Sequence, residues 1–192
     1  MNELHLQLCS SVEWGDHVEQ TLLPWVLAGL DLGASALEIG PGPGRTTDLL
    51  MSRVASLTAL EADADLAAAL ADRLTATSVT VVNADATAMP FQADRFDSAL
   101  SFTMLHHVPS RSLQDQLLAE VCRVVRPGGI FTGVDSQDSE AFRQIHEGDV
   151  CVPVESGDFR RRLIGAGFVG CQVELSDDRA RMRFLGRVPL HA

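Results

Sequence analysis

A loop with glycine at every second position constrains the fold of this chain more than any other stretch. An apolar segment at residues 36–39 leads into Gly40, Gly42 and Gly44, and one residue separates each glycine from the next. The pattern predicts a buried strand, a tight loop and a helix that begins near Arg45. Glycine lets the backbone turn sharply and lets a ligand approach it, and the N–H groups at a helix start bind polar or anionic ligands. We therefore expect a nucleotide-like cofactor at the carboxyl end of the first strand.

The spacing of these glycines indicates which cofactor the loop binds. The dinucleotide fingerprint would place its third glycine at position 45, which is Arg45 in this chain. The third glycine instead lies at position 44, and Glu38 precedes the first glycine by two residues. The pattern E-x-G-x-G-x-G is similar to the glycine-rich motif of class I S-adenosylmethionine-dependent methyltransferases.

Two more acidic residues follow the next predicted strands. The strand at residues 56–61 ends in Glu61, and the strand at residues 79–83 leads to Asp85. A carboxylate after the second strand can accept hydrogen bonds from both hydroxyls of a ribose. A carboxylate after the third can bind an adenine amino group, while the next N–H, that of Ala86, reaches a ring nitrogen. Each acid alone is a common turn or cap residue, but acids at the ends of three successive strands indicate a cofactor site.

The resemblance becomes specific over residues 37–134, about half of the chain. This stretch resembles the methyltransferase domain of the type that includes ubiquinone and menaquinone biosynthesis methyltransferases. The matching motifs are E-I-G-P-G-P-G, A-L-E-A-D, N-A-D-A-T-A-M-P-F, R-F-D-S-A-L-S, L-H-H-V and E-V-C-R-V-V-R-P-G-G. One departure is Glu61, where the family more often has Asp; either carboxylate can bind a ribose.

The resemblance implies an α/β fold, with a Rossmann-like sheet of seven mostly parallel strands, helices on both faces and an antiparallel last strand. We expect one methyltransferase domain over residues 1–192. Residues 1–33 would form a helical leader and a candidate flap, residues 34–135 the cofactor-binding half, and residues 136–192 the substrate side. The remaining predicted elements are helices at 64–74, 113–125, 142–146 and 156–165, a break at 126–129, and strands at 96–102, 130–135, 168–173 and 181–188.

The resemblance also implies the ligands and the residues that bind them. The cofactor would be S-adenosyl-L-methionine, held by Glu38, Gly40, Gly42, Gly44, Glu61, Ala62, Asp85, Ala86 and Ser101. The acidic composition, without a basic groove, favours a small-molecule acceptor over nucleic acid, and this acceptor would receive the methyl group by in-line transfer. The candidate catalytic residues are His106 and His107, after the fourth strand, and Asp135, at the end of the fifth. We expect His106 to line the acceptor pocket and His107 to pack against the next helix, so that binding or structural roles are favoured over proton transfer.

Three weaker candidates for the acceptor side lie elsewhere in the chain. His146 follows a short predicted helix, and His5 and Trp14 enter only if the leader covers the pocket. Ser11 is expected to cap a leader helix, and Pro24 to fit the start of a further helical turn.

Composition bears on partners and location. A formal net charge of −11 opposes binding to nucleic acid, and the basic run at residues 160–162 is expected to be a solvated helix face. The four cysteines are far apart and show no C-x-x-C spacing, so we expect neither a cysteine-bound zinc site nor a disulfide framework. No signal peptide is apparent and the most apolar stretch, residues 21–30, is too short to span a membrane. We expect a cytoplasmic protein, either a monomer or a homodimer.

Two alternatives from other functional classes stay open on the sequence. A non-catalytic S-adenosylmethionine-binding sensor or partner subunit would keep the same cofactor motifs and differ only in its acceptor pocket. A nicotinamide-dependent oxidoreductase could use the same sheet architecture, but Arg45 and the adenine-type acid Asp85 disfavour it.

Overall fold

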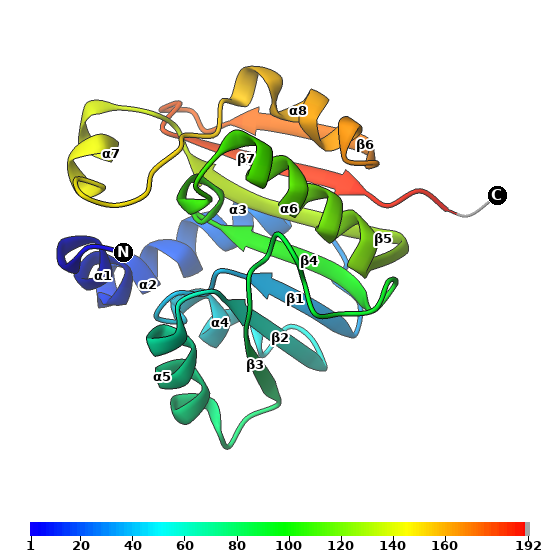
Figure 1. The fold of residues 1–192 in the computed structure, drawn as a ribbon, viewed down its shortest axis with the longest axis horizontal. Helices are drawn as coiled ribbons and strands as arrows, with labels where there is room; N and C mark the ends of the chain where they lie inside the picture. The colour runs from blue at the N-terminus through cyan, green and yellow to red at the C-terminus, as the bar shows by residue number, and fades with distance from the viewer. Residues whose placement is uncertain (191–192) are drawn as a thin grey trace.

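Seven strands form one sheet, with helices packed on both of its faces (Figure 1). The computed structural model describes residues 1–190. The strand order is β3-β2-β1-β4-β5-β7-β6. β1 to β5 run parallel, and β7 is antiparallel to both β5 and β6. The strands are β1 (Ser35–Ile39), β2 (Ser56–Glu61), β3 (Val79–Asn83), β4 (Phe96–Phe102), β5 (Val125–Ser136), β6 (Val169–Leu175) and β7 (Arg181–Arg187). The predicted fold class is confirmed.

Alternation along the strands divides the core between the two faces of the sheet, since successive strand residues point to opposite sides. Leu37 and Ile39 of β1 pack under α6 and α8, whereas Ala36 faces the leader helices. The helices are α1 (Glu3–Ser10), α2 (Val12–His17), α3 (Leu23–Leu27), α4 (Arg45–Leu50), α5 (Ala64–Leu74), α6 (Arg111–Val124), α7 (Glu140–Ile145) and α8 (Ser156–Gly165), with a π-helical turn η1 (Val18–Leu22) and a 3-10 turn η2 (Leu105–His107).

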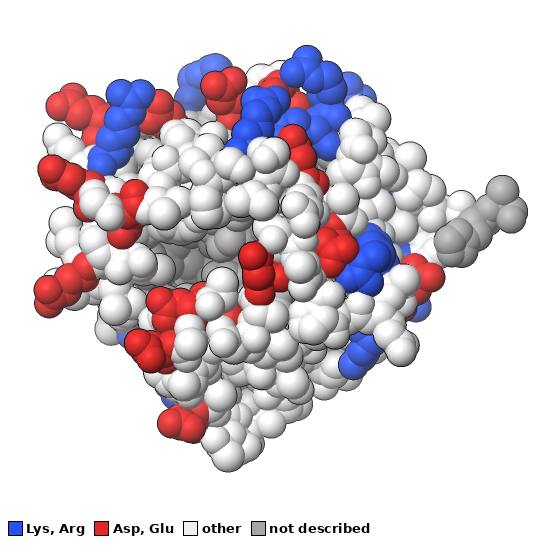
Figure 2. Space-filling model, viewed as in Figure 1, with Lys and Arg blue, Asp and Glu red and all other residues white. Residues whose placement is uncertain are grey.

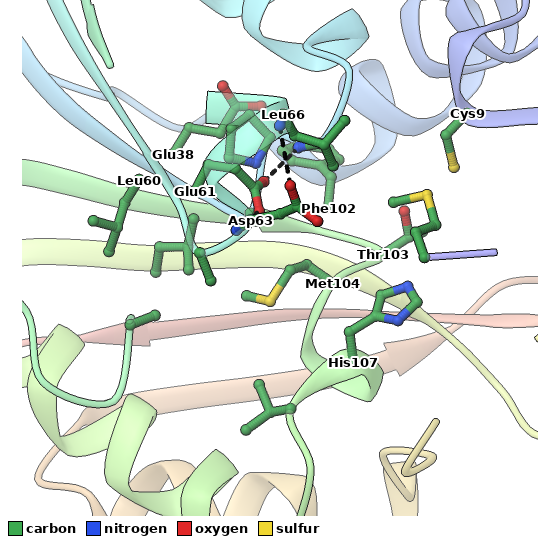
Figure 3. Close-up of a pocket in the computed structure, with 18 of the residues that line it drawn as sticks. Cys9, Glu38, Leu60, Glu61, Asp63, Leu66, Phe102, Thr103, Met104 and His107 are labelled. Atoms are coloured by element: carbon green, nitrogen blue, oxygen red, sulfur yellow. Dashed lines mark hydrogen bonds between the residues drawn. The ribbon is translucent and has the colours of Figure 1, made fainter. Parts of the chain in front are cut away.

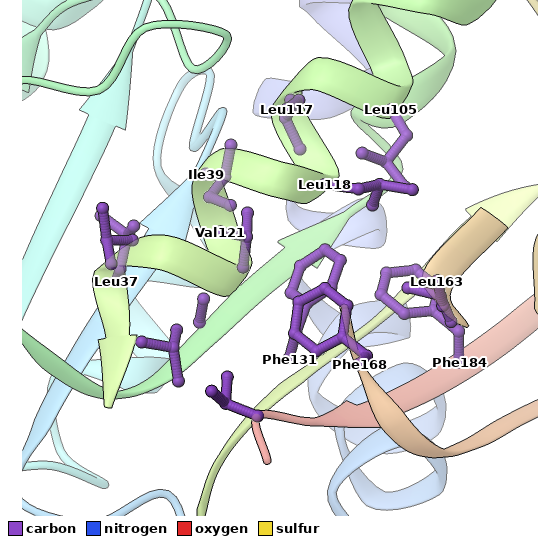
Figure 4. Packing of buried hydrophobic residues seen from close by; sticks show 14 of the residues in the cluster. Leu37, Ile39, Leu105, Leu117, Leu118, Val121, Phe131, Leu163, Phe168 and Phe184 are labelled. Atoms are coloured by element: carbon purple, nitrogen blue, oxygen red, sulfur yellow. The ribbon is translucent and has the colours of Figure 1, made fainter. Parts of the chain in front are cut away.

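The larger cluster of core side chains lies on the α6 and α8 side (Figure 4). Phe131 and Phe168 stack with ring centroids 5.8 Å apart, and Leu117 and Val121 of α6 are completely buried against the sheet. Burying one such side chain contributes about 1.5–3 kcal/mol. This packing fixes α6, and therefore the η2 turn that precedes it.

The leader forms a continuous helical run from residue 12 to 27. Ser11 caps it as predicted, because its hydroxyl accepts a hydrogen bond from the N–H of Trp14 at 3.0 Å. The π-helical turn interrupts the α pattern, and the N–H of Leu23 bonds to the carbonyl of Val18. Pro24 then lies in the first turn of α3, as predicted. Val18 and Leu23 are completely buried on the sheet, so this part of the leader belongs to the core.

Two sequence-based predictions about local structure away from the cavity were wrong. β5 begins at Val125, directly after α6, and not at residue 130. The run of residues 126–129 is extended because Val125 pairs with Phe96, and Gly128 and Gly129 exchange backbone hydrogen bonds with Val188. Arg162 is not solvated: its Nε donates to Asp115 at 2.6 Å, and its Nη2 donates to Gln114 at 2.9 Å.

Among residues 1–190, no helix has the length and apolar character needed to cross a lipid bilayer.

Candidate functional site

A cavity of about 430 Å³ opens at the carboxyl ends of β1 to β4. The glycine loop, the segments after β2 and β3, and the η2 region form one part of its wall, and α1 and α2 cover it from the leader side. Figure 2 shows the hollow on the face of the molecule, with Asp and Glu side chains more frequent around it than Lys and Arg. A volume of this size is typical of small-molecule and cofactor sites.

The glycine loop shapes the wall beneath the cavity. Gly42 lines it with φ +54, and its N–H donates to Glu61 Oε2 at 2.9 Å. A side chain at Gly42 would point into open space, where the nearest atom is Met1 Cε at 3.7 Å. Gly40 also lines the cavity, but Gly44 does not. Gly44 has φ +87 and a Cβ there would meet Leu70 Cδ1 at 2.4 Å, so this glycine packs the loop against α5 and is not exposed to a ligand.

Glu61 connects the end of β2 to the glycine loop. Its Oε2 accepts the bond from Gly42, and its Oε1 accepts a hydrogen bond from the N–H of Asp63 at 2.9 Å. Each carboxylate oxygen has a second lone pair. Glu61 lines the cavity together with Ala62, so the predicted ribose position fits the geometry.

The predicted adenine position lies at the end of β3. Asp85 and Ala86 both line the cavity, and Asp85 Oδ1 accepts a hydrogen bond from the N–H of Thr87 at 2.7 Å. Ser101 was predicted to bind the cofactor, but it does not line the cavity. It is completely buried inside β4, and the next residue, Phe102, reaches the cavity because neighbouring strand residues point to opposite faces.

Glu38 is a buried acid on the cavity wall. Only 2% of its surface is exposed, and this burial raises the pKa of its carboxyl from 4.5 to about 8. Its Oε2 has no hydrogen-bond partner among the described residues. An unpaired buried carboxyl oxygen beside a cavity provides a binding point for a cationic or hydrogen-bond-donating group.

The two candidate histidines after β4 have exchanged the places predicted for them. His107 lines the cavity, whereas His106 is 1% exposed and lies behind the wall. In a 3-10 turn, successive side chains point in directions about 120° apart, so η2 directs the two rings differently. His106 Nδ1 lies 2.6 Å from Asp135 Oδ1. Asp135 is itself completely buried and also lies away from the cavity, so the two residues form a pair that supports the wall.

His5 and His146 form one cluster with His106 and His107. The centroids of the His5 and His146 rings are 4.4 Å apart, and those of His5 and His107 are 5.0 Å apart. Burial is the main cause that lowers the pKa of His5 to about 4, that of His107 to about 3, and that of His146 below its ordinary value. No sequence spacing connects these residues, since the fold alone brings residues 5, 106–107 and 146 together.

The leader contributes directly to the cavity wall. His5 and Cys9 of α1 and Trp14 of α2 line it. Arg45, at the start of α4, donates from Nε and Nη2 to the carbonyl of Ser10 at 3.0 and 2.6 Å. Figure 3 shows Glu38, Glu61 and Asp63 grouped toward one side of the cavity and His107 toward the other, with Met104 between them. The cavity therefore has two sides. We call the side formed by the ends of β1 to β3, where the sequence predicts a cofactor, the cofactor side; the leader and the η2 region form the second side.

The family of the chain follows from a match over half of its length. A family model described as a methyltransferase domain matches residues 37–132. The chain belongs to the class I S-adenosylmethionine-dependent methyltransferases. The sheet order and the antiparallel last strands of the chain agree with that family.

Each of these curated relatives matches only about half of the chain. The chain is 33% identical over 107 residues, or 55% of its length, to a fatty-acid O-methyltransferase of Mycolicibacterium smegmatis, of which the match covers 38%. An uncharacterized methyltransferase of Mycobacterium avium is 34% identical over 98 residues, with 51% and 38% of the two chains covered. The matched regions span less than two fifths of these curated relatives.

Solved structures share the fold over nearly the whole chain. One is a chain in the complex of the Haloferax volcanii Trm112 methyltransferase activator with a methyltransferase, with a TM-score of 0.74, 14% identity, and 98% and 99% of the two chains covered. Another is Haemonchus contortus phosphoethanolamine N-methyltransferase 2 in complex with phosphomonomethylethanolamine and S-adenosylhomocysteine, with a TM-score of 0.75, 14% identity, and 97% and 57% covered. At these identities the likeness shows the fold alone.

Proposed function

We propose that this protein binds S-adenosyl-L-methionine in the cavity and transfers its methyl group to a small-molecule acceptor. One observation carries the proposal: Glu38, Glu61 and Asp85 line a single cavity at the ends of three successive strands, beside the glycine loop. Carboxylates at these places match the ammonium, ribose and adenine groups of the cofactor. The cofactor would supply a methyl group that its sulfonium already activates.

Each residue then has a role that the apo geometry supports. Glu61 is held by two backbone N–H groups and offers its remaining lone pairs to the ribose. Asp85 and the N–H of Ala86 would bind the adenine. Glu38, with its unpaired oxygen, would accept the ammonium group. Charge neutralisation by that group would favour the ionised form of Glu38, so binding is expected to release a proton.

The acceptor would lie on the second side of the cavity, near His107, Trp14 and Val150. Methyl transfer depends mainly on aligning the acceptor with the methyl group and on excluding water. Residues of the leader helices α1 and α2 line this side, and a cavity of about 430 Å³ supports a small molecule over a large polymer. The formal net charge of −11 gives no support to a nucleic acid substrate.

The relatives support the class of acceptor without identifying it. One relative is a fatty-acid O-methyltransferase, and one structural neighbour is a phosphoethanolamine N-methyltransferase. Fatty acids and phosphoethanolamine are both small molecules. One structural neighbour comes from a complex with the Trm112 methyltransferase activator. The alternative for this chain is therefore a role as a partner subunit or a non-catalytic protein.

Titration calorimetry with S-adenosylhomocysteine tests the cofactor assignment. The unaltered protein should bind it and should bind NAD far more weakly. Glu61→Ala should lose about 1.5–3 kcal/mol for each charge-assisted hydrogen bond removed, or roughly tenfold or more in affinity. Glu19→Ala, an exposed acid in η1, is the matched control and should bind as the unaltered protein does.

Two results would end the proposal. The first is NAD binding that is tighter than S-adenosylhomocysteine binding. The second is unchanged affinity in a folded Glu61→Ala protein. An assay of methyl transfer from a labelled donor to a panel of carboxylic acids, amines, phenols and thiols then separates the enzyme from the non-catalytic alternative, since a sensor would bind the cofactor and methylate none of them.

A further inference from the structure

Four histidines meet beside the cavity, although they come from distant parts of the chain. We define this histidine cluster as His5 of α1, His106 and His107 of η2, and His146 at the end of α7. One nitrogen each from His5, His107 and His146 lies within 4.8 Å of the other two. Such proximity of three imidazoles within a largely buried site is typical of a metal centre.

Every ring in the histidine cluster has an oxygen next to its Nδ1 atom. These oxygens assign the ring proton to Nδ1, because carbonyl and carboxylate oxygens only accept hydrogen bonds. The Nε2 atom of each neutral ring then carries a free lone pair. Metal-binding histidines show this same arrangement, with one nitrogen on the ion and the other held by an oxygen. The pairs are His5 Nδ1 with Asp149 Oδ2 at 3.3 Å, His107 Nδ1 with Val150 O at 3.2 Å, His146 Nδ1 with Phe142 O at 2.6 Å, and His106 Nδ1 with Asp135 Oδ1 at 2.6 Å.

The Nε2 atoms of two rings in the histidine cluster face each other at close range. Those of His106 and His146 lie 3.0 Å apart, and with both Nδ1 atoms protonated two lone pairs face each other. A shared proton or a metal ion resolves this conflict. Two nitrogens bound to one Zn²⁺ at about 2.0–2.1 Å, with an angle of roughly 90–110°, lie about 2.8–3.4 Å apart. The Nε2 of His107 is buried and has no hydrogen-bond partner among the described residues, so it has a lone pair to offer.

We propose that His5, His107 and His146 bind a divalent transition metal, Zn²⁺ first among them, with His106 as a fourth ligand or a neighbour of the ion. Ligand sets of imidazoles suit zinc, copper, nickel and iron, whereas magnesium and calcium prefer oxygen ligands. Burial keeps the rings neutral, as their lowered pKa values indicate, and the neutral ring is the form that binds a metal.

The ion would connect three segments around the cavity. It would hold α1 against η2 and against the end of α7, where Asn2 Nδ2 already donates to the carbonyl of Ile145 at 2.8 Å. Since His5 and His107 line the cavity, the ion would lie on its second side. An open coordination position there could bind an oxygen, nitrogen or sulfur atom of the acceptor. This role toward the acceptor rests on the proposed function, but the binding of the ion does not.

Titration of the full-length, tag-free and chelator-treated protein with Zn²⁺ tests the site. We expect about one ion per chain by calorimetry and by elemental analysis, and a melting temperature that rises with the metal and falls again with a chelator. His107→Ala and His146→Ala should each weaken Zn²⁺ binding by about tenfold or more. His17→Ala is the matched control, because His17 lies in α2 outside the histidine cluster, and it should bind Zn²⁺ as the unaltered protein does.

Further measurements distinguish the outcomes. His107→Gln, which keeps a polar side chain, repeats the test if the alanine variant does not fold. Co²⁺ should give visible absorption bands in the unaltered protein that are lost in His107→Gln. Glu61→Ala should lose S-adenosylhomocysteine binding and keep Zn²⁺, whereas His146→Ala should do the reverse, so failure of one proposal leaves the other standing. No binding at micromolar Zn²⁺, or equal binding by the histidine variants and the unaltered protein, would overturn the metal site and leave a shared proton between His106 and His146.

Discussion

At the scale of single residues, Glu38 combines a buried position with an unpaired oxygen, and this combination makes stability depend on pH. Below about pH 4.5 its carboxyl is protonated in both the folded and the unfolded chain. As the pH rises toward 8, the unfolded chain ionises while the folded chain keeps its proton. The unfolded state then binds fewer protons than the folded state, so ionisation favours unfolding.

We therefore expect the ligand-free protein to lose stability from Glu38 between about pH 4.5 and pH 8, and no more from this residue at higher pH. Glu38→Gln keeps the shape of the neutral acid and should remove this part of the pH dependence. Thermal unfolding of both proteins at a series of pH values measures it, and the advantage of the variant should grow with pH. Parallel curves across this window would contradict the buried, neutral state of Glu38.

The sequence anticipated the cofactor side of the cavity better than the opposite side. Glu38, Glu61 and Asp85 each follow a strand, and parallel strands bring their carboxyl ends to one edge, so local patterns are sufficient to place them. The histidine cluster depends on long-range packing. The order of His106 and His107 was predicted in reverse, because only the turn type of η2 decides which ring reaches the cavity.

At the scale of elements, the leader divides into two parts with different roles. The part from η1 onward is core, since Val18 and Leu23 are completely buried under the sheet. In α1 only His5 is buried, and the apolar Leu4 and Leu8 are exposed. α1 therefore covers the cavity and adds little to the core.

Removing residues 1–10 should spare the fold and the cofactor side but open the acceptor side. We expect S-adenosylhomocysteine affinity to change by less than about threefold, because Glu61 and Asp85 are unaffected, while methyl transfer is lost as water enters. Calorimetry and a transfer assay on the same preparation measure both effects. Removing residues 1–20 is a poorer test, since it also deletes Val18 from the core. Full transfer activity without α1 would refute its role as a cover.

Element boundaries were predicted well wherever one pattern decides them. The strand at Phe96–Phe102 and the helix at Ala64–Leu74 agree with the sequence to the residue. β5 was missed at its start because R-P-G-G is a strong local turn signal, and only pairing with Phe96 and Val188 keeps it extended. The π-helical turn before Pro24 likewise leaves no simple sequence signal.

At the scale of the whole molecule, residues from distant parts of the chain line the cavity, so a bound cofactor should stabilise the entire fold. A ligand that binds only the folded state at 100 times its dissociation constant contributes about 2.7 kcal/mol. For a domain of this size, each kcal/mol raises the melting temperature by about 2–4 °C. We expect S-adenosylhomocysteine to raise it by roughly 5–10 °C in a thermal scan, and Glu61→Ala to show a much smaller rise. Equal shifts in the two proteins would place the ligand elsewhere.

The division of the cavity wall also has a consequence for protein engineering. The cofactor side comes from residues 38–86, whereas the opposite side draws on α1, α2, η2 and the loop that contains Val150. Selectivity for the acceptor can therefore be altered by grafting or randomising the second set of segments while the first is left untouched. A library of variants in α1 and the Val150 loop would test new acceptors while the proposed methyl-donor site stays unchanged. The same separation gives natural sequence drift a route to new substrates that leaves the donor site intact.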